Sequence, residues 1–234
     1  MLKHTRIFLL LSLLLLLATG AAYLAFPKAE IHLWLNGTHN TFMDYAMRYY
    51  TVVGEWIPYL VVAALLFYKA GWATLLLADI ALSGGIAQIA KYAADTDRPY
   101  RWFAEHYPDI NLQFTEGVRL SKYYSFPSGH TTTFFCMFFV LTLVLTAYIT
   151  SQDKSDNSRQ WQISSVNILF FLMALSGAYS RIYLNQHFLE DIAGGVIIGI
   201  ATTILLLWPA QRLKDTKFWN WNIKNLLTSK PLNL

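Results

Sequence analysis

The chain has 234 residues, of which 55% are hydrophobic and only 14% are charged. This composition excludes an ordinary soluble globular protein, because several apolar runs approach the length that crosses a bilayer. The formal net charge is +4 at pH 7. Because the sequence contains no long run of Lys and Arg, we interpret the basic excess as membrane topology and expect no nucleic-acid partner. The single cysteine, Cys136, excludes an intramolecular disulfide.

Six apolar runs predict six transmembrane helices in an all-α, polytopic membrane bundle. They cover residues 7–26, 52–68, 72–90, 131–149, 163–180 and 189–208. The first run follows Lys3 and Arg6 and could be a signal peptide, because small residues at 18–22 offer a cleavage site. Its length favours an uncleaved first helix.

The segments between these runs differ in character. Residues 30–50 mix aromatic and polar side chains, which predicts an amphipathic interfacial helix that Asn40 could cap. The longest loop, 91–130, is expected to form a small extracytoplasmic cap of helix and loop. The polar stretch 151–162 predicts a shorter loop, and 209–234 predicts an interfacial tail on the cytoplasmic surface.

The distribution of Lys and Arg predicts the orientation in the membrane. With six spans and a cytoplasmic N-terminus, ten of the 18 basic residues lie inside and eight outside. Three of the outside residues, Lys91, Arg98 and Arg181, belong to a candidate site, and setting them aside leaves five. The bias then favours two cytoplasmic termini and a site that faces the periplasm or the cell exterior.

Three polar clusters fall on one side of such a bundle. One lies at the start of the long loop, one at its end, and one at the short turn between the last two spans. The residues that they bring to one rim are Lys91, Arg98, Ser128, Gly129, His130, Arg181, His187 and Asp191.

The spacing within the clusters supports a functional site. Lys91 and Arg98 are seven residues apart and share a helix face if the helix continues that far, although the following proline is expected to end it. Ser128 can cap the next helix, whose free N–H groups favour an anion. His187 and Asp191 are four apart, so the carboxylate can accept a hydrogen bond from one imidazole nitrogen and leave the other free to attack.

Three cations beside one carboxylate suit a tetrahedral anion such as phosphate. Phosphoryl transfer needs charge stabilisation over the equatorial oxygens and in-line positioning. Of the two histidines, one can attack phosphorus and the other can protonate the leaving oxygen. No second carboxylate is expected in the cluster, so the sequence predicts neither a di-metal site nor another cofactor.

The clusters resemble, in order and spacing, the signature of the type 2 phosphatidic acid phosphatase (PAP2) superfamily, which also includes vanadium haloperoxidases and bacterial acid phosphatases. That signature is Lys, six residues, Arg-Pro; then Pro-Ser-Gly-His; then Ser-Arg, five residues, His, three residues, Asp. This sequence matches all three parts without a departure. The resemblance covers a core at 91–191, and the six-helix plan extends it to a single membrane-embedded domain, 1–234.

The resemblance implies a role for each site residue. His187 would be the nucleophile and form a phosphohistidine, Asp191 would orient it, and His130 would be the general acid. The residues that would bind the phosphate are Lys91, Arg98, Ser128, Gly129 and Arg181. The reaction would be metal-independent hydrolysis of a lipid phosphate in the membrane.

The family also suggests the substrates. In a bacterium they would be undecaprenyl diphosphate, which is the first hypothesis, phosphatidylglycerol phosphate, phosphatidic acid or a lipid A phosphate. Arg119 and Lys122 in the long loop could contact the headgroup or a second phosphate, and an interfacial aromatic belt is the alternative for this loop.

Three other functions are alternatives. A lipid phosphotransferase would hand the phosphoryl group to another lipid, and a non-catalytic transporter would bind an anionic lipid without turnover. An intramembrane serine protease would use Ser128 with a histidine, but the sequence lacks a Gly-x-Ser-x-Gly elbow and the cations would be unexplained.

Several polar and small residues lie outside the signature or its roles. Asp79 lies within an apolar run, where a carboxylate is costly, and both a hydrogen bond between helices and a functional role are open. Gly194, Gly195 and Gly199 predict close helix packing. The remaining histidines have no partner at metal-ligand spacing and are expected at the surface; they are His4, His32, His39 and His106.

Overall fold

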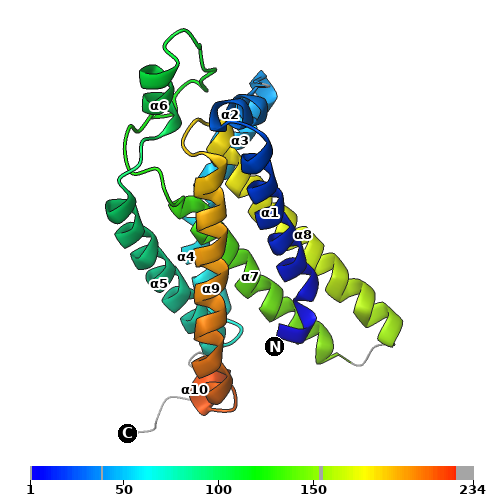
Figure 1. Cartoon of the computed structure of the whole chain (residues 1–234). Helices are drawn as coiled ribbons and strands as arrows, with labels where there is room; N and C mark the ends of the chain where they lie inside the picture. The colour runs from blue at the N-terminus through cyan, green and yellow to red at the C-terminus, as the bar shows by residue number, and fades with distance from the viewer. Residues whose placement is uncertain (1, 38, 153–154, 225–234) are drawn as a thin grey trace, which may run out of the picture.

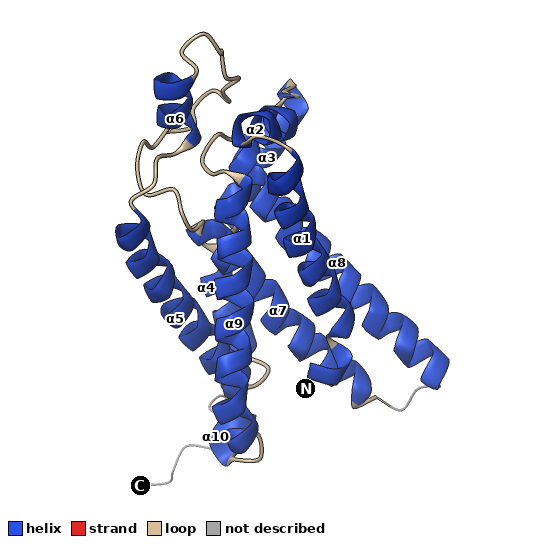
Figure 2. Cartoon of the chain, viewed as in Figure 1, coloured by secondary structure: helices blue, strands red, loops and turns tan. Residues whose placement is uncertain are grey.

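The computed structural model describes residues 2–37, 39–152 and 155–224. Every regular element in these ranges is helical, as the prediction of an all-α chain requires (Figure 2). The elements are the 3-10 helix η1 (Leu2–His4) and the α-helices α1 (Arg6–Ala25), α2 (Lys28–Asn36), α3 (Thr41–Val53), α4 (Ile57–Leu66), α5 (Ala70–Ala94), α6 (Pro99–His106), α7 (Gly129–Thr150), α8 (Asp156–Tyr183), α9 (Leu189–Leu213) and α10 (Lys217–Asn220).

Within the described ranges, five helical segments are each long and apolar enough to cross a membrane. They contain α1, α5, α7, α8 and α9. Helices α3 and α4 pass the same test only as a pair, and they meet at a bend of 46°. The chain is therefore a multi-pass membrane protein, and its five or six spans agree with the predicted six.

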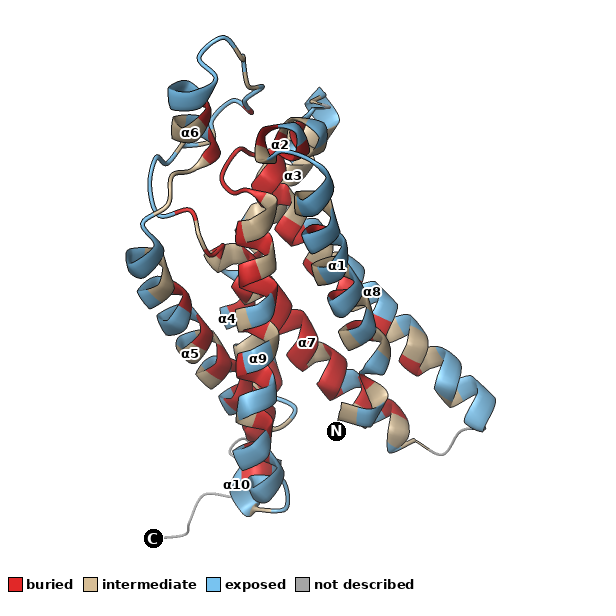
Figure 3. Cartoon of the chain, in the orientation of Figure 1, coloured by how far each residue is buried: buried red, intermediate tan, exposed pale blue. Residues whose placement is uncertain are grey.

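Helix α7 forms the centre of the bundle. It packs against α5, α8 and α9, and burial is concentrated along it (Figure 3). Phe139 of α7 stacks on Phe8 of α1 with ring centroids 5.2 Å apart, and Phe135 contacts the ring of Phe171 on α8. Leu24 at the end of α1 is 92% exposed, as expected for a side chain that faces lipid or the interface.

Three glycines allow α9 to approach α7 and the residues just before it closely. A Cβ atom at Gly195 would lie 2.7 Å from the carbonyl oxygen of Ser128, and one at Gly199 would lie 2.6 Å from a backbone oxygen of α7. A Cβ atom at Gly194 would lie 2.6 Å from the ring of Phe126. The predicted role of these glycines in packing is confirmed, and the contact holds the start of α9 beside the start of α7.

Two predicted segments are divided differently in the structure. The range 30–50 contains parts of two helices, α2 and α3, and the side chain of Asn40 caps α3 by accepting from the Met43 amide at 2.9 Å, as predicted. The predicted loop 151–162 is mostly helix, because α8 begins at Asp156. Polar residues at this helix start are exposed, which explains why hydropathy alone indicated a loop.

The predicted tail 209–234 also begins as helix. Helix α9 continues beyond Pro209, and α10 then folds back so that the ring of Trp219 lies 5.4 Å from that of Trp72 on α5. The described part of the tail packs against α5, and its position on the cytoplasmic surface stays a prediction. Residues 225–234 lie outside the described residues.

Asp79 is fully buried on α5, and its carboxylate accepts a hydrogen bond from the hydroxyl of Thr203 on α9. Of the two alternatives for Asp79, the structure shows the hydrogen bond between helices. This bond gives the buried carboxylate a donor within the apolar part of the bundle.

Figure 1 shows the two ends of the bundle. The start of the chain and α10 lie at one end, and α2, α6 and the loop after α6 lie at the other. Helix α6 and the loop at 107–128 form the predicted cap of helix and loop. The turn between α8 and α9 also lies at the cap end, so the parts of all three sequence clusters face the same region (Figure 1).

Candidate active site

Helix ends position the candidate site residues. Lys91 lies in the last turn of α5, His130 in the first turn of α7, and Arg181 in the last turn of α8. The turn to α9 carries His187, and Asp191 lies in the first turn of α9. The close packing of α9 on α7 and of α8 on α7 brings these ends together.

His187 and Asp191 form a buried pair. The Nδ1 atom of His187 lies 3.4 Å from Oδ2 of Asp191, and each residue is 1% exposed. The same Oδ2 accepts from the Ser125 hydroxyl at 2.5 Å and from the Phe188 amide at 2.8 Å. The carboxylate is therefore held in place, and Nε2 is the imidazole nitrogen that it leaves free.

The start of α7 is tied to this pair. The Ser128 amide donates to the Asp191 carbonyl at 2.9 Å, and the Ser128 hydroxyl accepts from the amide of Thr131 at 3.3 Å as the helix cap. A Cβ atom at Gly129 would lie 3.9 Å from Cε of Lys91, so the lysine side chain reaches this helix start. Within the described residues, the Ser128 hydroxyl bonds to neither histidine, which does not favour the serine-protease alternative.

Lys91 and Arg98 do not share a helix face, because α5 does not continue as far as Arg98. Helix α5 ends before Asp95, which adopts a left-handed φ of 41°, and the proline after Arg98 starts α6 instead of ending α5. The two cations converge through the cap loop: Lys91 Nζ donates to the Tyr124 carbonyl at 3.0 Å, and Arg98 Nε donates to the Tyr123 carbonyl at 2.9 Å.

Arg181 is 7% exposed and donates from Nη1 to the Thr51 hydroxyl on α3. Its Nε atom is buried and has no hydrogen-bond partner among the described residues. All three cations thus donate to neutral oxygens in the hydrogen bonds that hold them. Their positive charge remains available to stabilise an anion next to the histidine pair.

The same charges act on His187. Burial is the main cause that lowers the pKa of His187 well below its usual value, and the charges of Arg98, Arg181 and Lys91 lower it further. The carboxylate of Asp191 does not reverse this shift. The imidazole is therefore neutral near pH 7, which is the form that a nucleophile needs.

A polar stripe on α3 completes the site, and sequence reasoning missed it. The α3 stripe consists of Asp44, Arg48 and Thr51 on α3, and of Glu55 in the bend that follows the helix. The intervals of four and three residues put the three helical members on one face of α3, and this spacing was the signal that could have found them. Thr51 contacts Arg181, and Oε1 of Glu55 lies 3.0 Å from Nε2 of His130. The expectation of only one carboxylate in the cluster is therefore wrong.

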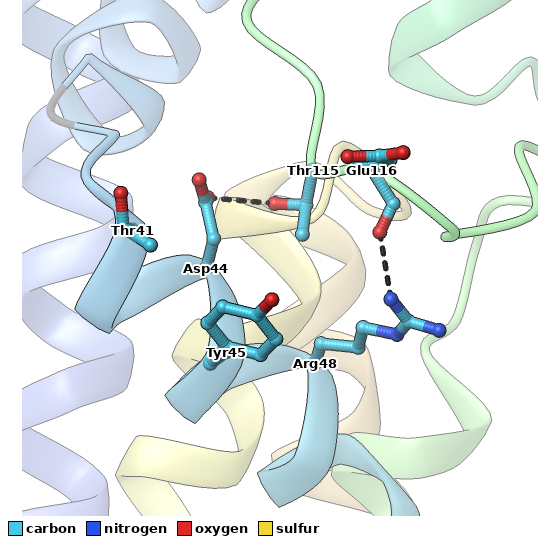
Figure 4. A pocket seen from close by; sticks show the side chains of 6 residues that line it. All are labelled: Thr41, Asp44, Tyr45, Arg48, Thr115 and Glu116. Carbon is cyan, nitrogen blue, oxygen red and sulfur yellow. Dashed lines mark hydrogen bonds between the residues drawn. The ribbon is translucent and has the colours of Figure 1, made fainter.

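The first half of the α3 stripe anchors the cap. Asp44 accepts from the Thr115 hydroxyl at 2.9 Å, and Arg48 Nη1 donates to the Glu116 carbonyl at 3.0 Å (Figure 4). A cavity of about 220 Å³ lies here, and its lining residues are Thr41, Asp44, Tyr45, Arg48, Thr115 and Glu116. None of these is a predicted site residue, so the cavity is separate from the convergence of groups around His187.

Gln186 is a second site neighbour that the sequence did not indicate. Its carbonyl accepts from Arg98 Nη1 at 3.1 Å, and its Nε2 donates to the Arg119 carbonyl at 3.1 Å. The Lys122 carbonyl accepts from the Arg98 amide at 2.9 Å. The backbones of Arg119 and Lys122 are therefore tied to the site, whereas their side chains are exposed.

His32 is buried, so its expected surface position is wrong. It is 1% exposed on α2, and its Nε2 lies 2.9 Å from Oδ1 of Asn185 in the turn between α8 and α9. Burial lowers the pKa of His32 to about 4. A neutral His32 therefore supports the turn that carries His187.

The comparison with known families agrees with this arrangement. A model of the PAP2 superfamily matches residues 72–215. The chain belongs to the PAP2 superfamily. The resemblance predicted from the sequence is confirmed, because the matched range includes all three clusters.

Two curated PAP2 relatives are similar over most of this chain. The lipid A 4'-phosphatase of Porphyromonas gingivalis is 26% identical over 185 residues, which is 76% of this chain and 70% of that protein. Phosphatidylglycerophosphatase B of Bacillus subtilis is 24% identical over 205 residues, which is 84% of this chain and 87% of that protein.

Two solved structures share the fold. LpxE from Aquifex aeolicus aligns with a TM-score of 0.60 at 20% identity, over 79% of this chain and 97% of that one. The first transmembrane PAP2-type phosphatidylglycerolphosphate phosphatase from Bacillus subtilis aligns with a TM-score of 0.55 at 23% identity. This alignment covers 93% of this chain and 100% of that one. At these identities the likeness establishes a PAP2 fold and nothing finer.

The PAP2 match begins after α3 and α4. Thr51 and Glu55, which contact Arg181 and His130, therefore lie outside the matched range. The site of this PAP2 protein combines a family core with contacts from its N-terminal third.

Proposed function

We propose that this PAP2 protein is a metal-independent phosphatase that hydrolyses a lipid phosphate or lipid diphosphate through a phosphohistidine at His187. The observation that carries the proposal is the buried pair of His187 and Asp191 beside three cations that donate to neutral oxygens. Such a site compensates the charge of a phosphoryl group before the reaction begins.

The proposed reaction has two steps. In the first, Nε2 of His187 attacks phosphorus, the bond from phosphorus to the lipid oxygen breaks, and His130 gives a proton to that oxygen. In the second, water attacks the phosphohistidine and returns a proton to His130. The groups assigned to the phosphoryl oxygens are Lys91, Arg98, Ser128, Gly129 and Arg181.

Two observations favour different substrates within this class. Exposed Arg119 and Lys122 beside the site could hold a second phosphate, which supports undecaprenyl diphosphate. Relatives named lipid A 4'-phosphatase and phosphatidylglycerophosphatase B support a lipid A phosphate or phosphatidylglycerol phosphate. Phosphatidic acid belongs to the same class of substrate.

A phosphate-release screen of the purified protein on these four lipids tests the function, with His187→Ala as the control. Hydrolysis predicts free phosphate that His187→Ala does not release. A phosphorylated acceptor lipid without free phosphate would identify a phosphotransferase. Binding without turnover in the parent protein would identify a transporter. We expect turnover to survive a chelator and vanadate to inhibit, because fixed cations stabilise the transferred group.

We place the protein in the bacterial inner membrane, with both termini in the cytoplasm and the site at the periplasm or cell exterior. The Lys and Arg distribution supports this orientation. In a Cys136→Ala background, a cysteine at exposed Asp109 in the cap should react with an impermeant reagent on intact cells, and a cysteine at exposed Ser155 should not. The opposite labelling pattern would move the site to the cytoplasmic face.

A further inference from the structure

The bend between α3 and α4 brings a carboxylate to the site. Gly54 and Glu55 lie in this bend, where the two helices meet at 46°. A Cβ atom at Gly54 would lie 2.7 Å from the ring of Phe134 on α7. Glycine therefore allows the bend to approach α7 closely, and Phe134 is one helical turn beyond His130.

The bend places Glu55 against His130. Oε1 of Glu55 lies 3.0 Å from Nε2 of His130, and this is the imidazole's only hydrogen bond among the described residues. Nδ1 is then the nitrogen available to a leaving oxygen. The Glu55 side chain is 49% exposed, so it is not part of the buried core of the bundle.

The charges around His130 indicate a role for the Glu55 carboxylate. The charged and titratable groups near the imidazole are Arg181 of α8, Lys91 of α5, Arg98 at the start of α6, His187 of the turn, and Glu55. A general acid must carry a proton, and three neighbouring cations disfavour a further positive charge on the imidazole. A hydrogen-bonded carboxylate favours the protonated imidazole and fixes its orientation.

We propose that Glu55 is a positioning residue for the general acid, an inference that rests on the proposed function. It orients His130 and stabilises the protonated imidazole until the bond from phosphorus to the lipid oxygen breaks. The proton on Nδ1 then passes to that oxygen, and the proton on Nε2 stays in the hydrogen bond with Glu55. Water returns a proton to Nδ1 when the phosphohistidine is hydrolysed.

The test compares two leaving groups that differ in their need for a proton. Dodecyl phosphate releases an alkoxide that requires a proton, whereas para-nitrophenyl phosphate releases a stable anion that does not. Glu55→Gln should lower kcat/KM for dodecyl phosphate by about tenfold or more and change that for para-nitrophenyl phosphate little. Glu105→Gln, which alters an exposed carboxylate of the cap, should leave both unchanged.

A double variant separates positioning from a structural effect. If Glu55 acts through His130, Glu55→Gln should add no loss in a His130→Ala background. A further loss in that background, or an equal loss on both phosphomonoesters, would overturn the inference. A melting temperature near that of the parent protein confirms that Glu55→Gln is folded.

The outcomes also separate this inference from the proposed function. Absence of His187-dependent phosphate release on every substrate removes the proposed function and the role of Glu55 with it. Phosphate release that depends on His187 but shows no leaving-group preference in Glu55→Gln removes the role of Glu55 alone.

Discussion

The two histidines of the site lie in unlike surroundings. The side chains of His187 and Asp191 are each 2% exposed, whereas those of His130 and Glu55 are 24% and 49% exposed. We use the name closed side for the turn between α8 and α9 together with its contacts. We use the name open side for the α3–α4 bend together with His130 and the surface of the cap. A nucleophile needs a fixed geometry before substrate arrives, whereas a general acid must exchange protons with water.

The closed side is held by many hydrogen bonds. The amides of Gln186 and His187 both donate to the Arg181 carbonyl, at 2.9 and 3.1 Å. Asn36 of α2 donates to the Tyr183 carbonyl at 2.8 Å from outside the turn. On the open side, His130 is held by one 3.0 Å contact between two partly exposed side chains. Reorganisation during the reaction should therefore be confined to the open side.

The largest expected effect tests the closed side directly. His187→Ala should abolish turnover because it removes the attacking nitrogen, and Asp191→Asn should lower kcat by about a hundredfold or more because the imidazole loses its orienting carboxylate. The measurement is phosphate release together with brief exposure to labelled substrate. Label recovered on His187 supports the assignment, and label on Ser128 would contradict it.

The next effect tests the packing that holds the closed side together. Gly195→Ala should destabilise the protein by about 1–3 kcal/mol, because its Cβ would lie 2.7 Å from the Ser128 carbonyl oxygen. Gly84→Ala is the matched control, since no atom lies within 4 Å of a Cβ at this exposed position on α5. Melting temperatures in detergent check the difference, and equal shifts would show that the α7–α9 contact is not tight.

A smaller effect concerns acid stability. The pKa of His32 is about 4 in the folded protein against an ordinary 6.5, so the stability from its neutral form is present above 6.5 and lost as pH falls toward 4. This amounts to about 2 kcal/mol at about pH 5. His32→Gln should reduce the drop in melting temperature between about pH 8 and about pH 5, whereas His106→Gln, at an exposed position, should not.

The smallest effect tests the open side of the site. Arg119→Ala combined with Lys122→Ala should lower kcat/KM for undecaprenyl diphosphate about fivefold more than for a lipid monophosphate, because exposed charges contribute about 1 kcal/mol or less each. The shape of the pH–rate profile should not change, since neither side chain is assigned to proton transfer. An equal loss on both lipids would remove the cap from headgroup recognition and weaken the case for the diphosphate.

The closed side was the more predictable of the two regions. His187 and Asp191 are four residues apart in the chain, and such a contact follows from helix geometry once the helix start is recognised. The bilayer imposes a minimum length on an apolar span, so most spans were also readable from hydropathy. Hydropathy predicted a loop at the start of α8 because the residues there are polar. That prediction was wrong, because a helix can continue beyond the apolar layer.

The sequence by itself determined the helical class, most of the spans and the three clusters, because these depend on periodicity and short spacing. Only the tertiary structure decided which side chain contacts the second histidine, His130. Glu55 and His130 are 75 residues apart, and their contact depends on the bend of 46° and on the close approach at Gly54. The burial of His32 depends likewise on how α2 packs against a turn 153 residues away. Contacts at such separations follow from how whole helices pack, and no local pattern in the chain encodes that.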